Sequence, residues 1–466
     1  MTIAVRVNMI MTKLDFVLFH KEFDDMLKEI SAVNARLNNL VKVGKELEAS
    51  RRRGLQWDFA CLLRELSGSL FKALDGATVR CCKCPHDVCL RLTLRILEME
   101  PGRGKEEVAK DVDFHVALGL YNTATSGYRI RVPSEWYNLL AIQNSPQEPG
   151  QGVSQPEPQS FRQRLRRRTR ATRTLIKESV KLILKHLTQL SSGLGLCEMI
   201  RAQPMTLTTA VDRVLYGHIQ DREIQRFFGL YAPALQQSGN HTHAHNFTLR
   251  QMLTRSSGVS SQNDVYPGID SLGFEGTFQL AVLVAINVLH LFNTPWLSKT
   301  ISLDDIKFRP RDEAPTTLYS RYSLAQEFGQ NFPYRPFISK VMPSSDGSVI
   351  LGASNPMSGL RPCEMTTSML GFVLIQIMLK KVIVELDINE DQRANTMTFE
   401  ECERMCNLGK RYESEVRGAA GPEYASAVMW CLESLVNING LDNDNFCHEF
   451  CDKVISRLQD ALGEFR

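Results

Sequence analysis

The chain has 466 residues, of which 43% are hydrophobic and 23% are charged. This length and composition predict two or three globular domains and exclude a collagen-like or wholly low-complexity protein. The 55 Lys and Arg residues nearly balance the 52 Asp and Glu residues, so net charge gives no support to nucleic-acid or membrane-surface binding by the whole molecule. The 12 cysteines are too scattered for a disulfide framework, and an intracellular, cytoplasmic location is expected.

Residues 1–78 are predicted to form a helical N-terminal region. Apolar residues recur there at spacings of four and three on one helical face: Met26, Ile30, Val33, Leu37 and Leu40. A second apolar stripe covers residues 55–74, and Arg51–Gly54 between the two stripes predicts a turn. The pattern favours a helical hairpin or the end of a bundle. A coiled-coil element for self-association is the alternative.

Residues 79–235 are predicted to form a small sheet-containing lobe. Three segments have the alternation of antiparallel strands: Leu90–Ile96, Asp113–Tyr121 and Tyr128–Val132. A linker at 144–174, rich in Pro, Gln, Gly and Ser, interrupts this lobe and is too polar to form a packed core. The arginine run Arg162–Arg173 within it is interpreted as a solvated segment, with a nuclear-import signal as the alternative.

Residues 236–466 are predicted to form a larger helical lobe. The segments Phe278–Phe292 and Thr366–Leu386 are apolar all round, so both helices are expected at its centre. Phe278–Phe292 is too short for a membrane span, and a buried core helix is predicted instead. The proline-rich stretch between these helices predicts loops. The fold class is therefore α+β and mainly helical, with a helical hairpin or bundle preceding a small and a large lobe.

This order of lobes, together with four local motifs, resembles a protein kinase. Leu249–Leu253 resembles the short helix after the kinase hinge, and Gln279–Phe292 resembles the long helix of the large lobe. Asp305–Phe308 resembles the strand entered by the metal-binding Asn, and Ser368–Leu379 resembles a buried kinase helix. The resemblance implies a two-lobe, kinase-like domain.

More specifically, the chain resembles a fungal family of unknown function with a degenerate kinase-like domain. Members of that family often carry a helical N-terminal region of the HeLo or prion-inhibition type. The resemblance covers about residues 55–466. Its motifs stand here as Thr294, Pro295, Trp296 and Leu297; Asp305, Ile306 and Phe308; Pro336–Lys340; Gly421–Leu432; and Cys82–Leu92.

The residues that phosphoryl transfer requires are not found in the sequence. That reaction needs a phosphate-binding glycine loop, a lysine, a catalytic Asp and metal-binding carboxylates. The sequence has no G-x-G-x-x-G loop, no D-F-G and no carboxylate between His290 and Asp304. The motif Thr294–Leu297 is therefore predicted to be structural or vestigial, with Trp296 filling the place of the catalytic loop. No catalytic residue and no cofactor is expected.

A thiol and imidazole cluster precedes the first predicted strand and contains Cys82, Cys84, His86 and Cys89. These are zinc-ligand types, but the usual two separated ligand pairs are missing. Buried thiols at the start of a strand are the favoured interpretation, and a metal site is the alternative.

The sequence thus predicts a non-enzymatic, kinase-like protein, a pseudokinase, that acts as an interaction or signalling scaffold for an unidentified protein partner. The fungal resemblance implies a role in incompatibility or defence-type responses. Two alternatives stay open: an atypical nucleotide-binding or phosphotransfer enzyme that uses Asp304, Asp305 and a displaced Lys, and a metal-stabilised regulatory module. Specific nucleic-acid binding and a membrane span are not expected.

Overall fold

The computed structural model divides the chain into two compact units, Met1–Gln56 and Trp57–Arg466. The residues that it describes are 3–78, 86–93, 103–120, 135–144, 196–201, 215–231, 246–256, 267–297, 301–310, 332–342, 362–386, 399–434, 441 and 443–464. The predicted strand Tyr128–Val132, the arginine run Arg162–Arg173, and Cys82 and Cys84 lie outside these residues.

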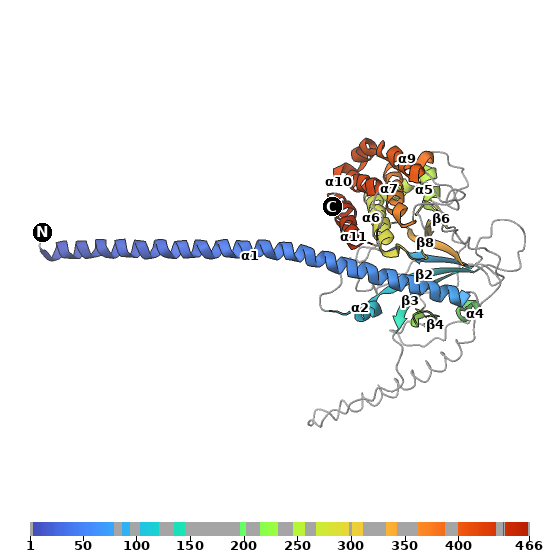
Figure 1. The fold of residues 1–466 in the computed structure, drawn as a ribbon, viewed down its shortest axis with the longest axis horizontal. Helices are drawn as coiled ribbons and strands as arrows, with labels where there is room; N and C mark the ends of the chain where they lie inside the picture. The colour runs from blue at the N-terminus through green and yellow to red at the C-terminus, as the bar shows by residue number, and fades with distance from the viewer. Residues whose placement is uncertain are drawn as a thin grey trace, which may run out of the picture. The chain divides into compact units, whose positions relative to one another are not determined.

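Helix α1, Ile3–Thr78, forms the first unit and continues into the second (Figure 1). It runs without interruption through Arg51–Gly54, so the predicted hairpin turn is wrong. Arginine is among the good helix formers, and a glycine inside a helix costs only about 1 kcal/mol. Three arginines and one glycine therefore do not end a helix whose apolar periodicity continues on both sides.

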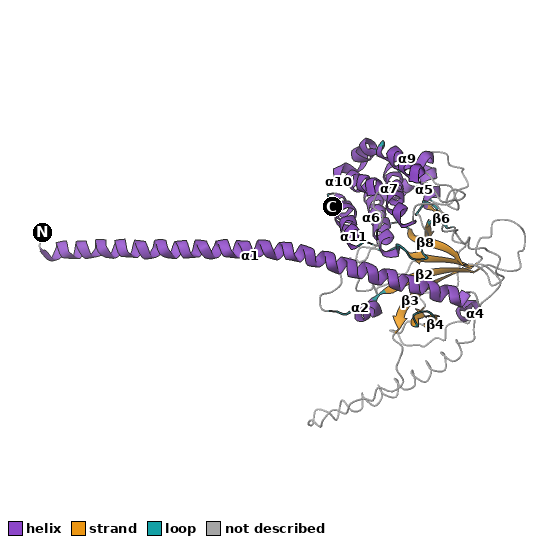
Figure 2. Cartoon of the chain, viewed as in Figure 1, coloured by secondary structure: helices purple, strands orange, loops and turns teal. Residues whose placement is uncertain are grey.

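The described strands form one eight-stranded sheet in the order β4-β5-β3-β2-β1-β8-β7-β6, with antiparallel neighbours (Figure 2). The strands are β1 His86–Arg91, β2 Asp113–Leu120, β3 Glu135–Asn144, β4 Leu215–Asp221, β5 Arg226–Tyr231, β6 Phe247–Thr248, β7 Ile306–Pro310 and β8 Tyr334–Met342. The sheet takes strands from both predicted lobes, because β6, β7 and β8 follow residue 236.

Strand β2 confirms the predicted segment Asp113–Tyr121 to within one residue. The strand predicted at Leu90–Ile96 instead begins at His86 and ends at Arg91. The structure also has strands that the sequence did not predict, including β3, which ends where the predicted linker 144–174 begins, and β8 in the proline-rich stretch.

Strand β8 tolerates Pro336 because of its register. It pairs with β7 over Tyr334–Ile338, whereas its pairing with β1 begins only at Phe337. Pro336 lies opposite Phe308 of β7. On the β1 side it lies just beyond the paired residues, and there its carbonyl accepts a hydrogen bond from the Leu92 backbone N–H at 3.0 Å. A proline without an N–H fits a position where the pairing with one neighbouring strand has ended.

The described helices after α1 include two that are buried along most of their length, α6 and α7. Their bounds are α2 Lys105–Asp111, α4 Leu196–Arg201, α5 Leu249–Ser256, η1 Ile269–Leu272, α6 Gly273–Leu291, α7 Pro362–Leu379, η2 Val384–Leu386, α9 Phe399–Lys410, α10 Glu413–Glu433, α11 Asp444–Phe450, the π-helical turn η5 Cys451–Ile455 and α12 Ser456–Gly463. Residues Gly276–Leu291 of α6 are all buried, as the sequence predicts for a core helix. By length and composition, the segment Ile269–Leu291 could also span a membrane, and 78% of its most apolar stretch is buried inside the protein.

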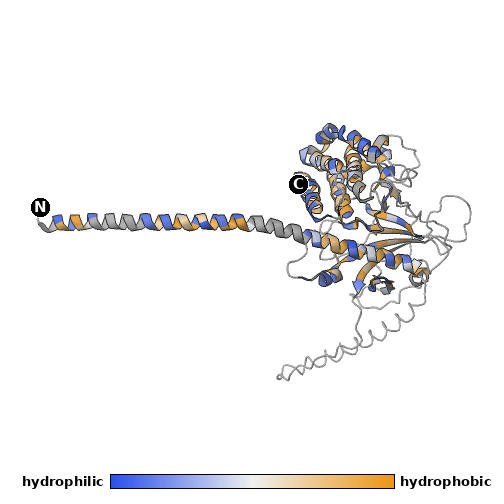
Figure 3. Cartoon of the chain, viewed as in Figure 1, coloured by the Kyte–Doolittle hydropathy of each residue, from blue (hydrophilic) through white to orange (hydrophobic). Residues whose placement is uncertain are grey.

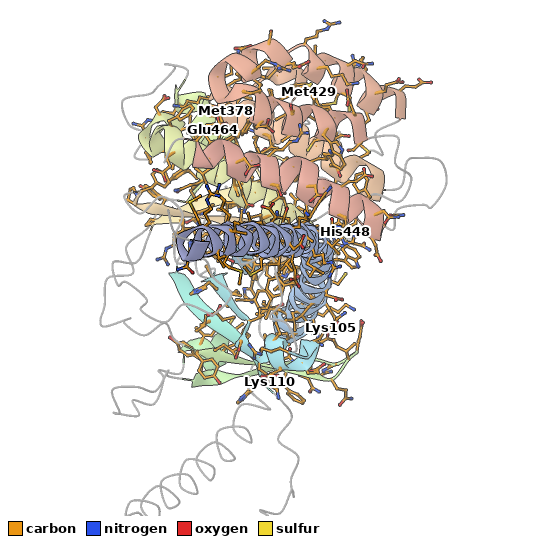
Figure 4. The ribbon with its side chains drawn as sticks, turned by 90° about the vertical axis from the view of Figure 1, so that its left-hand side faces the viewer. Lys105, Lys110, Met378, Met429, His448 and Glu464 are labelled. Atoms are coloured by element: carbon orange, nitrogen blue, oxygen red, sulfur yellow. The ribbon has the colours of Figure 1, made fainter. Side chains whose placement is uncertain are left out.

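Helices α7 and α10 pack closely through a small residue and a buried hydrogen bond. A Cβ added at Gly371 of α7 would lie 2.9 Å from Leu432 Cδ2 and 3.1 Å from Cys431 Cβ of α10, so a larger residue there would have to displace these side chains. The Tyr424 hydroxyl donates to the Leu374 carbonyl at 2.9 Å. Figure 4 shows Met378 of α7 and Met429 of α10 in the helical layer, and Lys105 and Lys110 of α2 on the other side of the second unit.

Candidate functional site

The loop after α6 is the place where the kinase resemblance locates a catalytic loop. Asn293 has a φ of 57°, the left-handed conformation that often ends a helix. The Thr294 hydroxyl donates to the Leu291 carbonyl at 2.6 Å, and the Thr294 backbone N–H donates to the same oxygen at 3.1 Å. These bonds satisfy a carbonyl that the end of α6 would otherwise leave unpaired. Pro295 is exposed and Leu297 is buried.

Trp296 fills the interior of this loop. Its side chain is completely buried, and the indole N–H donates to the Ser67 carbonyl of α1 at 2.7 Å. Its ring also meets Phe71 edge to face, with ring centroids 5.1 Å apart. An indole that is buried and satisfied in this way fixes the loop to the part of α1 that belongs to the second unit.

Arg64 of α1 joins the same part of the helix to the end of α6. Its Nε donates to the Leu289 carbonyl at 2.8 Å, and its Nη1 donates to the Leu441 carbonyl at 2.9 Å. The guanidinium carbon lies 5.1 Å and 5.2 Å from the centres of the Trp57 and Phe292 rings. A cation at the C-terminal end of a helix is favourable because the helix dipole is negative there.

The two carboxylates that could bind a metal ion take part in structural interactions. Arg250 Nε lies 3.0 Å and 2.9 Å from the two carboxylate oxygens of Asp304. Asp305 accepts hydrogen bonds from the Ser302 backbone N–H at 2.9 Å and the Ser302 hydroxyl at 2.8 Å. Asp304 therefore anchors α5, and Asp305 closes the turn that leads into β7.

The rest of the Asp305–Phe308 motif lies in the sheet. Ile306 and Phe308 are completely buried. Phe308 stacks on Phe247 of β6, with ring centroids 5.3 Å apart and an interplanar angle of 10°. The side chains of Ile306 and Phe308 hold β7 in place and have no polar atom with which to bind a ligand.

A small pocket opens beside α6, between the sheet and α1. It is lined by residues that include Leu63, Ser67, Phe114, Asn287 and His290. The Asn287 side-chain amide donates hydrogen bonds to the Leu283 carbonyl at 2.7 Å and to the Thr93 carbonyl at 3.2 Å. The enclosed space holds about one water molecule. This pocket is therefore too small for a nucleotide.

The candidate metal ligands His86 and Cys89 have different neighbours and do not lie side by side. His86 Nε2 lies 3.3 Å from the Cys197 thiol, whereas Cys89 packs with Ala117 and Phe337. Residues three apart on a strand point to opposite faces of a sheet, so His86 and Cys89 cannot bind one ion. Within the described ranges no group of three or more potential metal ligands is found. Burial raises the pKa of the Cys89 thiol despite the nearby cations of Arg309 and Lys307.

Two arginines that hold the site together, Arg64 and Arg250, were not predicted from the sequence. Arg64 ties α1 to α6, and Arg250 neutralises Asp304. The signal for Arg64 is its position, because it interrupts an apolar stripe in which the neighbouring Leu63 and Leu66 are buried. Long side chains can keep a charge satisfied at such positions while burying their stems.

The chain belongs to a protein family described as a domain of unknown function, DUF7580, whose model matches residues 194–465. The matched residues contain α6, the loop with Trp296, β7, β8 and the later helices, whereas α1 and β1–β3 precede them. No curated protein and no solved structure matches the chain.

Proposed function

We propose that the protein is a non-catalytic, kinase-like scaffold, a pseudokinase, that works by binding other proteins. The observation that carries this proposal is that the key side chains of the loop after α6, and of the turn that follows it, take part in structural interactions. Trp296 occupies its interior, Asp304 is paired with Arg250, and Asp305 closes a turn. Phosphoryl transfer depends on carboxylates that are available for Mg²⁺ and for the attacking hydroxyl. At this loop the carboxylates serve the fold instead.

The kinase-like part of the proposal is supported by where the four motifs fall. The hinge-helix motif is α5, the long-helix motif is α6, the metal-strand motif is β7 and the buried-helix motif is α7. A fold can keep its core while its chemistry is absent, because packing and catalysis place different demands on a sequence. The proposed role in intracellular incompatibility or defence signalling rests on the fungal resemblance.

The protein-binding part is supported by α1. Within the first unit, eight large apolar side chains between Met26 and Val43 are 46–67% exposed. A contiguous exposed apolar surface of this kind marks an interaction site. Figure 3 shows the alternating polar and apolar bands along this helix.

Thermal unfolding with and without ATP and Mg²⁺ tests the proposal. A ligand at 100 times its dissociation constant adds about 2.7 kcal/mol of stability, which shifts the melting temperature by a few degrees. We expect no shift with ATP and Mg²⁺ together beyond that with Mg²⁺ alone. A Mg²⁺-dependent shift that the Asp304→Asn variant lacks would contradict the proposal and support the atypical nucleotide-binding enzyme.

A further inference from the structure

We infer that the exposed helix of the first unit binds a second copy of this chain as an antiparallel coiled coil centred between Ser31 and Ala32. This inference deepens the proposed function, because it names the first partner of the scaffold. It rests on four observations about residues 24–44: their exposure, their heptad spacing, their balanced charge and the placement of two charges that have no ion-pair partner among the described residues.

The apolar side chains follow a strict heptad repeat. Using the usual letters a to g, the d positions are Met26, Val33 and Leu40, and the a positions are Ile30 and Leu37. All five are 46–67% exposed. In the sequence the same spacing continues to Phe23, Phe19 and Phe16 on one side and to Gly44 and Leu47 on the other, which makes more than four heptads.

A strict heptad repeat indicates the kind of partner. On a straight helix, with 3.6 residues per turn, a seven-residue repeat drifts by about 20° per heptad. The stripe stays on one continuous interface only if the helix supercoils with another helix of the same repeat. A second copy supplies such a helix at equal length.

The charges between Asp24 and Gly44 argue against a lipid surface as the partner. Three acidic residues, Asp24, Asp25 and Glu29, balance three basic residues, Lys28, Arg36 and Lys42. Helices that lie on membranes are rich in Lys and Arg on the polar face. A neutral polar face fits a protein partner better.

Two flanking charges select the orientation. Glu29 and Arg36 both occupy g positions at the edge of the stripe, and among the described residues neither has an ion-pair partner. In a parallel, in-register pair, g positions lie beside e positions of the other helix, so Glu29 would face Asn34 and Arg36 would face Val41. That arrangement leaves both charges without a partner.

In an antiparallel pair, g positions lie beside g positions. If Ile30 faces Val33 of the second copy, then Met26 faces Leu37 of the second copy. Glu29 of each chain then lies beside Arg36 of the other, which forms two equivalent ion pairs. The same register places Gly44 opposite position 19, where the sequence has the large residue Phe. One register therefore satisfies size and charge together.

Sedimentation of the full chain measures the dimer dissociation constant, with circular dichroism to show that each variant stays folded. We expect a dimer at micromolar concentration. Ile30→Asp should abolish it, because it puts a charge into the centre of the apolar interface. Lys28→Glu, on the adjacent outward f position, is the matched control and should leave the dissociation constant unchanged.

Charge reversal tests the orientation. Glu29→Lys places Lys beside Arg36 of the second copy, and Arg36→Glu places Glu beside Glu29 of the second copy. Each variant alone should weaken the dimer by roughly tenfold, because two attractive pairs become repulsive. An equimolar mixture of the two variants should recover the wild-type affinity, since every pair is then again of opposite charge. In a parallel dimer neither substituted residue lies beside a charge of the second copy, so neither substitution should change the dissociation constant.

Several results would overturn the inference. These are a monomeric wild-type protein, a dimer that survives Ile30→Asp, a dimer that is indifferent to both charge reversals, and binding to anionic vesicles without dimer formation. The nucleotide experiment keeps the two proposals apart. If the protein is a monomer and ATP does not shift its melting temperature, the dimer inference is wrong and the scaffold proposal stands. If the protein is a dimer and binds ATP with Mg²⁺, the scaffold proposal is wrong and the dimer inference stands.

Discussion

Single residues at the junction of α1 and α6 make interactions that stabilise the fold. Trp296 brings a large buried ring and a satisfied N–H to the junction of α1 and α6. Arg64 adds two hydrogen bonds to backbone carbonyls at the same junction. Here the tryptophan and the arginine use their polar atoms within the protein.

The two parts of the Trp296 contribution can be separated by substitution. Trp296→Phe keeps an aromatic ring and removes the hydrogen bond to Ser67, so we expect a loss of about 1 kcal/mol in the free energy of unfolding. Trp296→Ala also empties the site and should cost about 3–5 kcal/mol. Urea denaturation measures both values. Equal stability of Trp296→Ala and the wild type would show that the ring does not hold the loop.

At the scale of elements, α10 depends on one glycine. Its helical course is broken at Gly421, where φ is 84° and ψ is 175°, immediately before Pro422. Proline is favoured in the first turn of a helix, so the second half of α10 begins there as a new helix. The sequence itself marks this break, because a glycine followed by a proline is typical helix punctuation. The kink lets one segment continue the helical layer in a new direction.

Two alanine substitutions on α10 should act in opposite directions. A side chain added at Gly421 would meet no atom within 4 Å, so any cost of Gly421→Ala comes from the backbone conformation alone. That conformation costs about 1–3 kcal/mol for a residue with a Cβ. Gly418 is exposed in a regular helical turn, and Gly418→Ala should stabilise the protein by about 1 kcal/mol. Melting temperatures of the two variants on the same side of the wild-type value would contradict this account.

Elements with a distinctive apolar pattern could be predicted from the sequence. The core helices α6 and α7 are apolar on all sides over the length of a helix, and in β2 large apolar residues recur at every second position. Strand β8 could not be predicted, since Pro333 before it and Pro336 within it indicate a loop until the register shows Pro336 beyond the pairing with β1. Contacts such as those of Arg64 with Leu289 and Leu441 join residues hundreds of positions apart, and no local pattern encodes them.

At the scale of the whole molecule, α1 belongs to both compact units. Residues up to Gln56 form the first unit, and residues from Trp57 belong to the second. In the second unit five large apolar residues of α1 are 0–2% exposed: Phe59, Leu63, Leu66, Leu70 and Leu74. The exposed stripe of the first unit and the buried stripe of the second thus lie on one continuous helix. The fold and the proposed dimer therefore depend on different parts of it.

Truncation at the two boundaries should separate these roles. A chain that begins at Trp57 keeps the buried stripe, and we expect it to melt within a few degrees of the full chain and to be monomeric. A chain that begins at residue 79 loses the five buried side chains. Burial of each contributes about 1.5–3 kcal/mol, so their loss removes roughly 7–15 kcal/mol, as much as the whole stability of a typical domain. This shorter chain should show no cooperative melting. A folded product would mean that α1 only covers a core that is complete without it, and Trp296 could then not depend on Ser67 for its position.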